Sequence, residues 1–283
     1  MRRFQNTFLL AAFGPLLSLL LVSFLLAGCS NQETPKTDPQ LHAQSQDYSS
    51  GRLLAHFKNG NQATLGPGLH LLNISTGPRD GMIYVPSSYR ALKPAPLLLF
   101  LHGNRGTAQM GVDDFIRESE RTGIIFLFPD SRKRTWDRVI DDAFGPDAEF
   151  VDQALQAAFN SLAIDRRHVG IGGFSDGASY SLSLGQTNGD LFTHIIAFSP
   201  GGSEPASQNG RPPVFIIHGF RDDVLPIDKC SRVIVPELKS DGYTVTYTEF
   251  DGRHQMTPEG KVLALDWFLK TAPQLSPPPA PRP

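Results

Sequence analysis

Residues 172–185 read GGFSDGASYSLSLG, and the first six positions hold three glycines and one serine. An apolar, strand-like segment, HVGIGG (residues 168–173), precedes this serine, and a run of small residues typical of a helix follows it. The chain must therefore change from strand to helix within three or four residues, and Gly173 and Gly177 permit the close backbone approach that this needs. The context predicts that Ser175 is a nucleophile exposed at the carboxyl edge of a sheet, the alternative being a packed turn of small residues.

Short apolar runs and amphipathic segments alternate along the chain on both sides of this turn, which is typical of β-α units in a buried parallel sheet. The pattern predicts an α/β fold in one domain, residues 51–273, with a doubly wound, mostly parallel sheet, an antiparallel start and helices on both faces. We expect strands at residues 68–74, 80–85, 96–101, 124–128, 168–172, 193–198, 214–217 and 244–250, and helices at 110–122, 147–162, 176–184, 229–240 and 258–269.

A serine nucleophile at neutral pH needs a base and an acid, which in this architecture follow it along the chain in the order acid, then histidine. His254 lies in EFDGRHQMTPEG (residues 249–260), directly after the last expected strand, whereas His194 and His218 leave no room before them for an acid-bearing loop. The segment VFIIHGFRDDVLP (residues 214–226) puts Asp222 and Asp223 just beyond a buried strand. Periodicity alone does not separate these two acids.

Two backbone N–H groups are expected to stabilise the oxyanion that forms when an ester carbonyl is attacked. One belongs to Asp176, which follows the nucleophile, and the other to Asn104 in the loop HGNRG (residues 102–106). His102 is expected to be a structural side chain beneath that loop. Trp136, in PDSRKRTWD (residues 129–137), is expected either to line an acyl or aryl pocket or to pack its loop onto the domain.

Four segments in this order, LHGNRG (101–106), GFSDGA (173–178), HGFRDDVLP (218–226) and FDGRH (250–254), resemble the α/β-hydrolase superfamily. The resemblance is closest to its phospholipase/carboxylesterase and polyhydroxybutyrate-depolymerase-like esterases. It implies that the acid is Asp222, that the position after the His-Gly pair, Asn104, supplies an oxyanion donor, and that no metal or organic cofactor is needed. Asp176 departs from the Gln or Ala of many relatives, and its carboxylate is expected either to disfavour anionic substrates or to raise the pKa of neighbouring groups by charge repulsion.

These features together predict a serine esterase that acts on a small-molecule or polymeric ester through an acyl-enzyme intermediate. A peptidase of the prolyl-oligopeptidase type is one alternative, because its nucleophile turn and acid loop are similar. A surface protein that kept the fold and lost catalysis is another. The formal net charge of −2 and the absence of a basic stripe in the sequence argue against a nucleic-acid partner.

The first 28 residues read as a targeting segment, with positive charge at Arg2 and Arg3 and an almost wholly apolar run over residues 8–27. The run ends in LAGC (residues 26–29), which resembles the cleavage box of bacterial lipoproteins and implies lipidation of Cys29. A transmembrane anchor is the alternative. Residues 29–50 are expected to be a flexible tether, and residues 274–283 a proline-rich tail. Because Ser30 follows the cysteine, a lipid anchor in the outer membrane of the cell envelope is favoured.

Overall fold

The structure, a computed structural model, describes residues 47–57 and 63–272. The expected signal segment, the lipidation site at Cys29, most of the tether and the proline-rich tail lie outside the described residues. The strands are β1 (Gly68–Leu71), β2 (Gly81–Val85), β3 (Ala95–Leu101), β4 (Ile125–Pro129), β5 (Ile164–Phe174), β6 (His194–Phe198), β7 (Val214–Gly219) and β8 (Val245–Phe250). The helices are α1 (Ala108–Thr122), α2 (Asp137–Ile140), α3 (Pro146–Ser161), α4 (Asp176–Thr187), α5 (Ser231–Ser240) and α6 (Pro258–Lys270).

All eight strands form one sheet in the order β1-β2-β4-β3-β5-β6-β7-β8. The pairs β1–β2 and β2–β4 are antiparallel and every later pair is parallel, which confirms the expected doubly wound sheet with an antiparallel start. The chain leaves β3 toward β4 on one side and returns to β5 on the other. Ligands of such sheets bind at the carboxyl edge where the strand order reverses, here the ends of β3 and β5.

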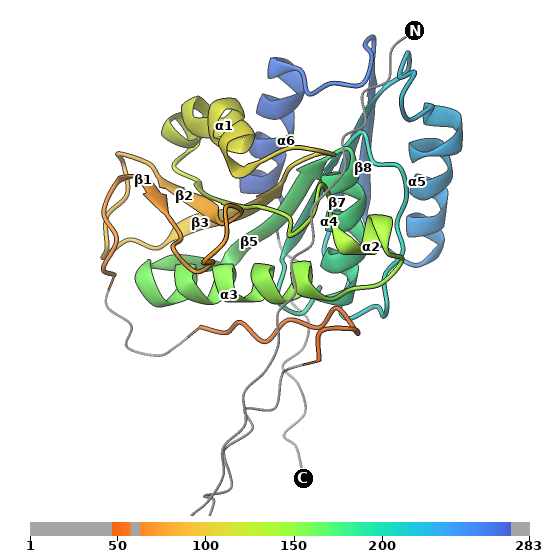
Figure 1. Cartoon of the computed structure of the whole chain (residues 1–283). Coiled ribbons are helices and arrows are strands. Elements are labelled where there is room, and N and C mark those ends of the chain that lie inside the picture. Colours follow the sequence, from red (N-terminus) through yellow and green to blue (C-terminus); the bar gives the residue numbers. More distant parts are fainter. Residues whose placement is uncertain (1–46, 58–62, 273–283) are drawn as a thin grey trace, which may run out of the picture. The chain divides into compact units, whose positions relative to one another are not determined.

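Two apolar layers sandwich the sheet, because successive residues of a strand face opposite sides. In β3, Leu97, Leu99 and Leu101 belong to one core cluster, and Leu98 and Phe100 belong to the other. The first cluster includes residues of α3, α4 and α5, and the second includes residues of α1 and α6. Figure 1 shows these two groups of helices on opposite faces of the sheet. Each helix therefore buries one apolar stripe on a sheet whose strands are apolar on both faces.

Some boundaries differ from the expected ones for identifiable reasons. Helix α1 begins at Ala108, two residues early, where the backbone N–H of Ala108 donates to Asp130 Oδ1 at 2.6 Å. The four-residue α2 is too short to give a periodic pattern and was not expected. Tyr48 donates to Asp152 Oδ2 at 2.8 Å, so contact with the domain starts before the expected boundary at residue 51. Within residues 47–57 and 63–272, no helix has both the length and the apolar character needed to span a membrane.

Candidate active site

Ser175 occupies a strained turn between β5 and α4, with φ of 57° and ψ of −121°. Its backbone N–H donates to Phe198 O on the neighbouring strand β6 at 2.9 Å, which holds the turn against the sheet. A Cβ on Gly173 would lie 2.3 Å from Gly177 O, and one on Gly177 would lie 2.2 Å from Leu101 O. Only glycine therefore fits at these two positions, and the surrounding structure forces a non-glycine residue into an unfavourable conformation, as in a nucleophile elbow.

A chain of two hydrogen bonds joins Ser175 to Asp222 through His254. Ser175 Oγ lies 2.8 Å from His254 Nε2, and His254 Nδ1 lies 2.7 Å from Asp222 Oδ2. Because a carboxylate only accepts, Nδ1 carries the hydrogen and Nε2 is left to accept the serine hydroxyl. The sequence order placed these three side chains on the loops after β5, β7 and β8, and the structure brings them together. Ser175 is only 7% exposed, less than the open position expected, because His254 and the loop after β3 cover it.

Asp222 is the acid that reaches the histidine. The backbone N–H groups of Val224 and Leu225 donate to its Oδ1 at 2.9 and 2.8 Å. Burial by itself raises the pKa of Asp222, but the hydrogen bonds from Leu225 and His254 outweigh it and hold this pKa below the ordinary value. Asp223 instead points outward to an ion pair with Arg253. The geometry thus separates two acids that periodicity left equivalent.

His218 is a site residue that the sequence reasoning missed. Its Nε2 lies 3.1 Å from Asp222 Oδ2 and 2.9 Å from Leu225 O, and its Nδ1 lies 2.7 Å from Ser231 Oγ. Both partners of Nε2 are acceptors, so Nε2 carries the hydrogen and Nδ1 accepts from the serine hydroxyl. Burial lowers the pKa of His218, which favours this neutral form. The spacing of four residues between His218 and Asp222, present in the sequence, was the signal that could have found this contact.

The loop between β3 and α1 lies directly against Ser175, since a Cβ on Gly103 would be 3.3 Å from Ser175 Cβ. In this loop Gly106 N donates to Gly103 O at 3.0 Å and Arg105 N donates to Arg134 O at 2.7 Å. Across the described part of the chain, the N–H groups of Asn104 and Asp176 form no hydrogen bond to a protein acceptor. The N–H of Asp176 belongs to the first turn of α4, where intrahelical acceptors are lacking. Two donors beside Ser175 are thus unoccupied by protein acceptors.

His102 and Trp136 lie beneath this loop. His102 Nε2 accepts from Ser131 N at 3.1 Å while Nδ1 donates to Gly103 O at 2.7 Å, and burial lowers the pKa of His102. Trp136 has no exposed surface, and its Nε1 donates to His102 O at 2.8 Å. His102 is structural, as expected. The pocket-lining alternative for Trp136 is wrong, because the ring is fully buried against His102 of the loop after β3 and Tyr180 of α4.

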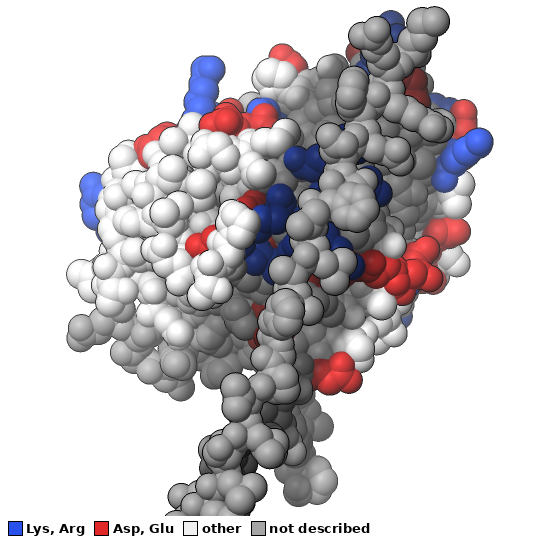
Figure 2. Space-filling view, in the orientation of Figure 1, with Lys and Arg blue, Asp and Glu red and all other residues white. Residues whose placement is uncertain are grey.

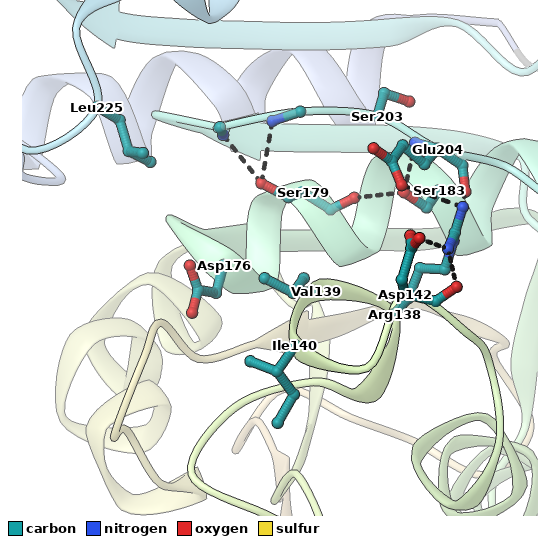
Figure 3. A pocket seen from close by; sticks show the side chains of 12 residues that line it. Arg138, Val139, Ile140, Asp142, Asp176, Ser179, Ser183, Ser203, Glu204 and Leu225 are labelled. Atoms are coloured by element: carbon teal, nitrogen blue, oxygen red, sulfur yellow. Dashed lines mark hydrogen bonds and ion pairs between the residues drawn. The ribbon is translucent and has the colours of Figure 1, made fainter.

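A pocket of about 330 Å³ opens beside the nucleophile turn, between α2, the first two turns of α4 and the loop after β6 (Figure 3). Asp176, Val139, Ile140 and Leu225 are among its lining residues. Among the residues that the structure describes, no group of three or more His, Cys, Asp or Glu side chains could hold a metal ion.

Two arginines lie on the loop that contacts Ser175 and on the loop hydrogen-bonded to it. Figure 2 shows Lys and Arg side chains collected near the middle of the face drawn there. Arg105 and Arg134 are exposed and their loops are joined by a backbone hydrogen bond. Neither forms an ion pair with any residue in the described ranges. The site therefore has charge of both signs available near Ser175.

Solved structures with the same fold include several hydrolases. Esterase PE8 superposes with a TM-score of 0.56 at 20% identity, covering 68% of this chain and 98% of that chain. The fluorophosphonate-binding serine hydrolase FphF of Staphylococcus aureus gives a TM-score of 0.58 at 14% identity, covering 73% and 100%. An acylaminoacyl peptidase of Pyrococcus horikoshii gives 0.55 at 17% identity, covering 76% of this chain and 43% of that chain. At these identities the likeness concerns the fold.

The sequence itself matches a family model. No curated protein matches the chain as a relative. Residues 127–272, just over half of the 283-residue chain, match the model of the phospholipase/carboxylesterase family. This range contains Ser175, Asp222 and His254, and solved hydrolase structures share the fold around them. The chain therefore belongs to the phospholipase/carboxylesterase family of α/β-hydrolases.

Proposed function

We propose that the protein is a serine esterase that cleaves carboxylic esters through an acyl-enzyme, with Ser175 as nucleophile, His254 as base and acid, and Asp222 as the orienting carboxylate. The observation that carries this proposal is the hydrogen-bond chain from Ser175 Oγ through His254 to Asp222, at 2.8 and 2.7 Å. Nucleophile, base and orienter within hydrogen-bond reach are the arrangement that activates a serine hydroxyl.

In the first half of the proposed reaction, Ser175 Oγ attacks the ester carbonyl carbon while its proton passes to His254 Nε2. The carbonyl oxygen becomes an oxyanion that accepts from the N–H groups of Asn104 and Asp176, helped by the positive end of α4. The tetrahedral species collapses, the bond to the alcohol oxygen breaks, and His254 returns its proton to that oxygen. The alcohol leaves and the acyl group remains on Ser175.

In the second half, water attacks the acyl carbonyl and gives a proton to His254 Nε2. Collapse of the second tetrahedral species breaks the bond to Ser175 Oγ, which takes the proton back as the carboxylic acid leaves. Asp222 keeps Nδ1 of His254 protonated throughout and stabilises the imidazolium in both halves. Each step uses groups of this chain together with the ester and water.

The experiment compares wild type, Ser175→Ala and Ser240→Ala on p-nitrophenyl butyrate, together with labelling by a fluorophosphonate probe. Ser240 is an exposed serine at the end of α5 and serves as the matched control. We expect Ser175→Ala to lose labelling and at least about a thousandfold in kcat, while Ser240→Ala retains both. Wild-type protein that neither labels nor hydrolyses would favour the alternative of an inactive binding protein.

The leaving group of the substrate distinguishes an esterase from the alternative, a peptidase. Acyl transfer from an amide demands protonation of a poorer leaving group, so an esterase discriminates strongly between matched substrates. We expect kcat/KM for an amino-acid p-nitrophenyl ester to exceed that for the corresponding p-nitroanilide by far more than the ratio of their uncatalysed rates. A ratio equal to the uncatalysed one or smaller would favour the peptidase.

We further propose that the enzyme is attached to the cell envelope through lipid on Cys29. The support is the sequence LAGC after a basic start and an apolar run. Expression with radiolabelled palmitate should label the wild type and not Cys29→Ser, and the variant should lose membrane association. Membrane association without lipid incorporation would favour the transmembrane anchor instead.

A further inference from the structure

The pocket beside Ser175 carries an excess of negative charge. Its lining contains the carboxylates of Asp142, Asp176 and Glu204 and the single guanidinium of Arg138. Arg138 is fully engaged, since it contacts Asp142 Oδ1 at 2.7 Å and Glu204 Oε2 at 3.1 Å. With all four side chains ionised, the lining has a net charge of −2.

The negative groups lie at two ends of the pocket. Glu204 N donates to Ser183 Oγ at 2.9 Å, which puts Glu204 about two turns along α4 from Asp176, or about 10 Å. Figure 3 shows the same separation, with Asp176 at the start of α4 and Arg138, Asp142 and Glu204 gathered at the far end. The charge nearest to the nucleophile is therefore that of Asp176 alone.

The carboxylate of Asp176 differs from the other two in its lack of a partner within the described ranges. This carboxylate is half-buried, and within the described ranges no hydrogen bond or ion pair involves it, whereas Asp142 and Glu204 are more exposed and paired with Arg138. The hydroxyls on the pocket floor are also occupied. Ser179 Oγ accepts from Gly201 N at 2.9 Å, and Ser183 Oγ donates to Ser179 O at 2.8 Å. A ligand in this pocket thus finds one strong acceptor that has not been satisfied.

We propose that this pocket selects esters that carry a protonated primary, secondary or tertiary amine within a few bonds of the reacting carbonyl, and that Asp176 determines this selectivity. The inference rests on the proposed function, because it assumes that Ser175 is the nucleophile. An N–H group of the ammonium donates a charge-assisted hydrogen bond to the Asp176 carboxylate. The amine must be close, because the Cα atoms of Ser175 and Asp176 are only about 3.8 Å apart.

The rest of the lining suits the alkyl part of such a substrate. Val139 and Ile140 of α2 and Leu225 of the acid loop supply apolar surface around the carboxylate. The twelve residues that line the pocket include no aromatic side chain, so a quaternary ammonium would find neither a cation-π partner nor a use for the carboxylate as a hydrogen-bond acceptor. A short aliphatic ammonium is the chemistry that fits.

Two matched substrate series test the proposal on either side of the ester bond. In the first, p-nitrophenyl esters of β-alanine, butyric acid and succinic acid carry an acyl group that is cationic, neutral or anionic. In the second, thioacetates of 2-(dimethylamino)ethanethiol, 3-methylbutanethiol and 3-mercaptopropionate vary the leaving group in the same way. Each kcat/KM is divided by the uncatalysed hydrolysis rate, which removes differences in intrinsic reactivity.

For the wild type we expect the cationic member to exceed the anionic one by about tenfold or more in at least one series, and Asp176→Asn to reduce that ratio by about tenfold. Asp223→Asn, which removes an exposed carboxylate paired with Arg253 outside the pocket, should leave the ratio within about twofold of the wild type. The ratio of cationic to anionic kcat/KM is compared, rather than a single rate, because the backbone N–H of Asp176 also donates to the oxyanion and a shift of this backbone would change the rate for every substrate.

Two results would overturn the proposal. One is an unchanged ratio in Asp176→Asn in both series. The other is faster turnover of the anionic member, which would assign the selectivity to the guanidinium groups of Arg105 and Arg134. Failure of the esterase proposal is recognised separately, because the neutral butyrate would then be hydrolysed equally by wild type and Ser175→Ala.

Discussion

The imidazoles of His218 and His254 donate to the same oxygen, Oδ2 of Asp222, at 3.1 and 2.7 Å. The two bonds hold the Asp222 carboxylate from two different segments, since His218 lies at the end of β7 and His254 lies in the loop after β8. Because a donor on an oxygen weakens that oxygen as an acceptor for a second donor, His218 tempers the interaction between Asp222 and His254. We regard His218 as a positioning residue.

Replacing His218 should therefore change both the rate and its pH dependence. In His218→Phe, which has no donor for Asp222, we expect kcat to fall by about tenfold with little change in KM, because Asp222 and His254 lose orientation. We also expect the acid limb of kcat/KM to move to higher pH by up to about one unit, since Oδ2 then stabilises the protonated His254 more strongly. Initial rates from pH 4 to 9 measure both effects.

The matched control for this variant is Ser231→Ala, which removes only the hydroxyl that His218 Nδ1 accepts from. It should keep the acid limb within about 0.3 units of the wild type. A lower kcat in His218→Phe with an unmoved acid limb would mean that His218 is merely a packing residue.

Substitution of the two neighbouring acids, Asp222 and Asp223, should have very different effects on kcat. Asp222→Asn is expected to lower kcat by about 10⁴, because an amide no longer fixes the tautomer of His254 or stabilises its charged form. Asp223→Asn should stay within about twofold of the wild type, since Asp223 is exposed and its partner in the described part of the chain is the exposed Arg253. Steady-state kinetics of both variants, with circular dichroism to verify folding, separate the two. Equal losses would contradict the assignment of the acid.

In the proposed reaction the Ser175 hydroxyl gives its proton to His254, so the rate should depend on the protonation of His254. A protonated His254 has no lone pair at Nε2 and cannot take the proton of Ser175, so kcat/KM should decline as the pH is lowered. Rates on p-nitrophenyl butyrate from pH 4 to 8, corrected for the ionisation of p-nitrophenol, follow this limb. A rate that stays level down to pH 4 would exclude His254 as the base.

Stability should also depend on pH, through a histidine far from the site. Burial lowers the pKa of His194 from 6.5 to about 4, and its Nε2 donates to Thr271 O at 3.0 Å. The unfolded chain therefore binds a proton that the folded chain rejects between these values, so stability is full above about pH 6.5 and is lost as the pH falls toward 4. The loss amounts to about 3 kcal/mol.

Urea unfolding at a series of pH values measures this loss. His194→Gln should be less stable at neutral pH but should show a flatter dependence between pH 6.5 and 4. An equal slope in the variant and the wild type would assign the acid sensitivity to other groups.

The glycines of the nucleophile turn should tolerate no side chain. In Gly177→Ala the new Cβ would lie 2.2 Å from Leu101 O and 2.5 Å from His102 O, so the turn and the loop after β3 must separate. We expect a cost of about 2 kcal/mol, a fall in Tm of roughly 5 °C and a loss of most activity. Gly66→Ala, where a Cβ meets nothing within 4 Å, is the control and should change neither. Thermal unfolding and esterase assays compare the two.

The sequence predicted the sheet and the three linked side chains because both depend on local patterns. Buried parallel strands are apolar runs, as in PLLLFL, and the carboxyl ends of such strands meet at one edge, which brings Ser175, Asp222 and His254 together. The glycine spacing around Ser175 indicates the sharp turn directly.

The supporting contacts could not be predicted because they join segments that share no local signal. Arg79, in the segment before β2, donates to Gly106 O at 2.9 Å and contacts His102 Nε2 at 3.2 Å, which steadies the loop that holds Asn104. Trp136 is likewise enclosed by His102 of the loop after β3 and by Tyr180 of α4, contacts that only the folded chain provides. Such contacts depend on packing between distant elements rather than on periodicity.

The central claim is that Ser175 carries the acyl group during turnover. Rapid acid quenching of the enzyme mixed with excess p-nitrophenyl butyrate, followed by peptide mass mapping, tests it most directly. We expect a butyryl adduct on the peptide that contains Ser175, formed at the rate of the p-nitrophenol burst and missing in Ser175→Ala. An adduct on another residue, or continued turnover by Ser175→Ala, would contradict it.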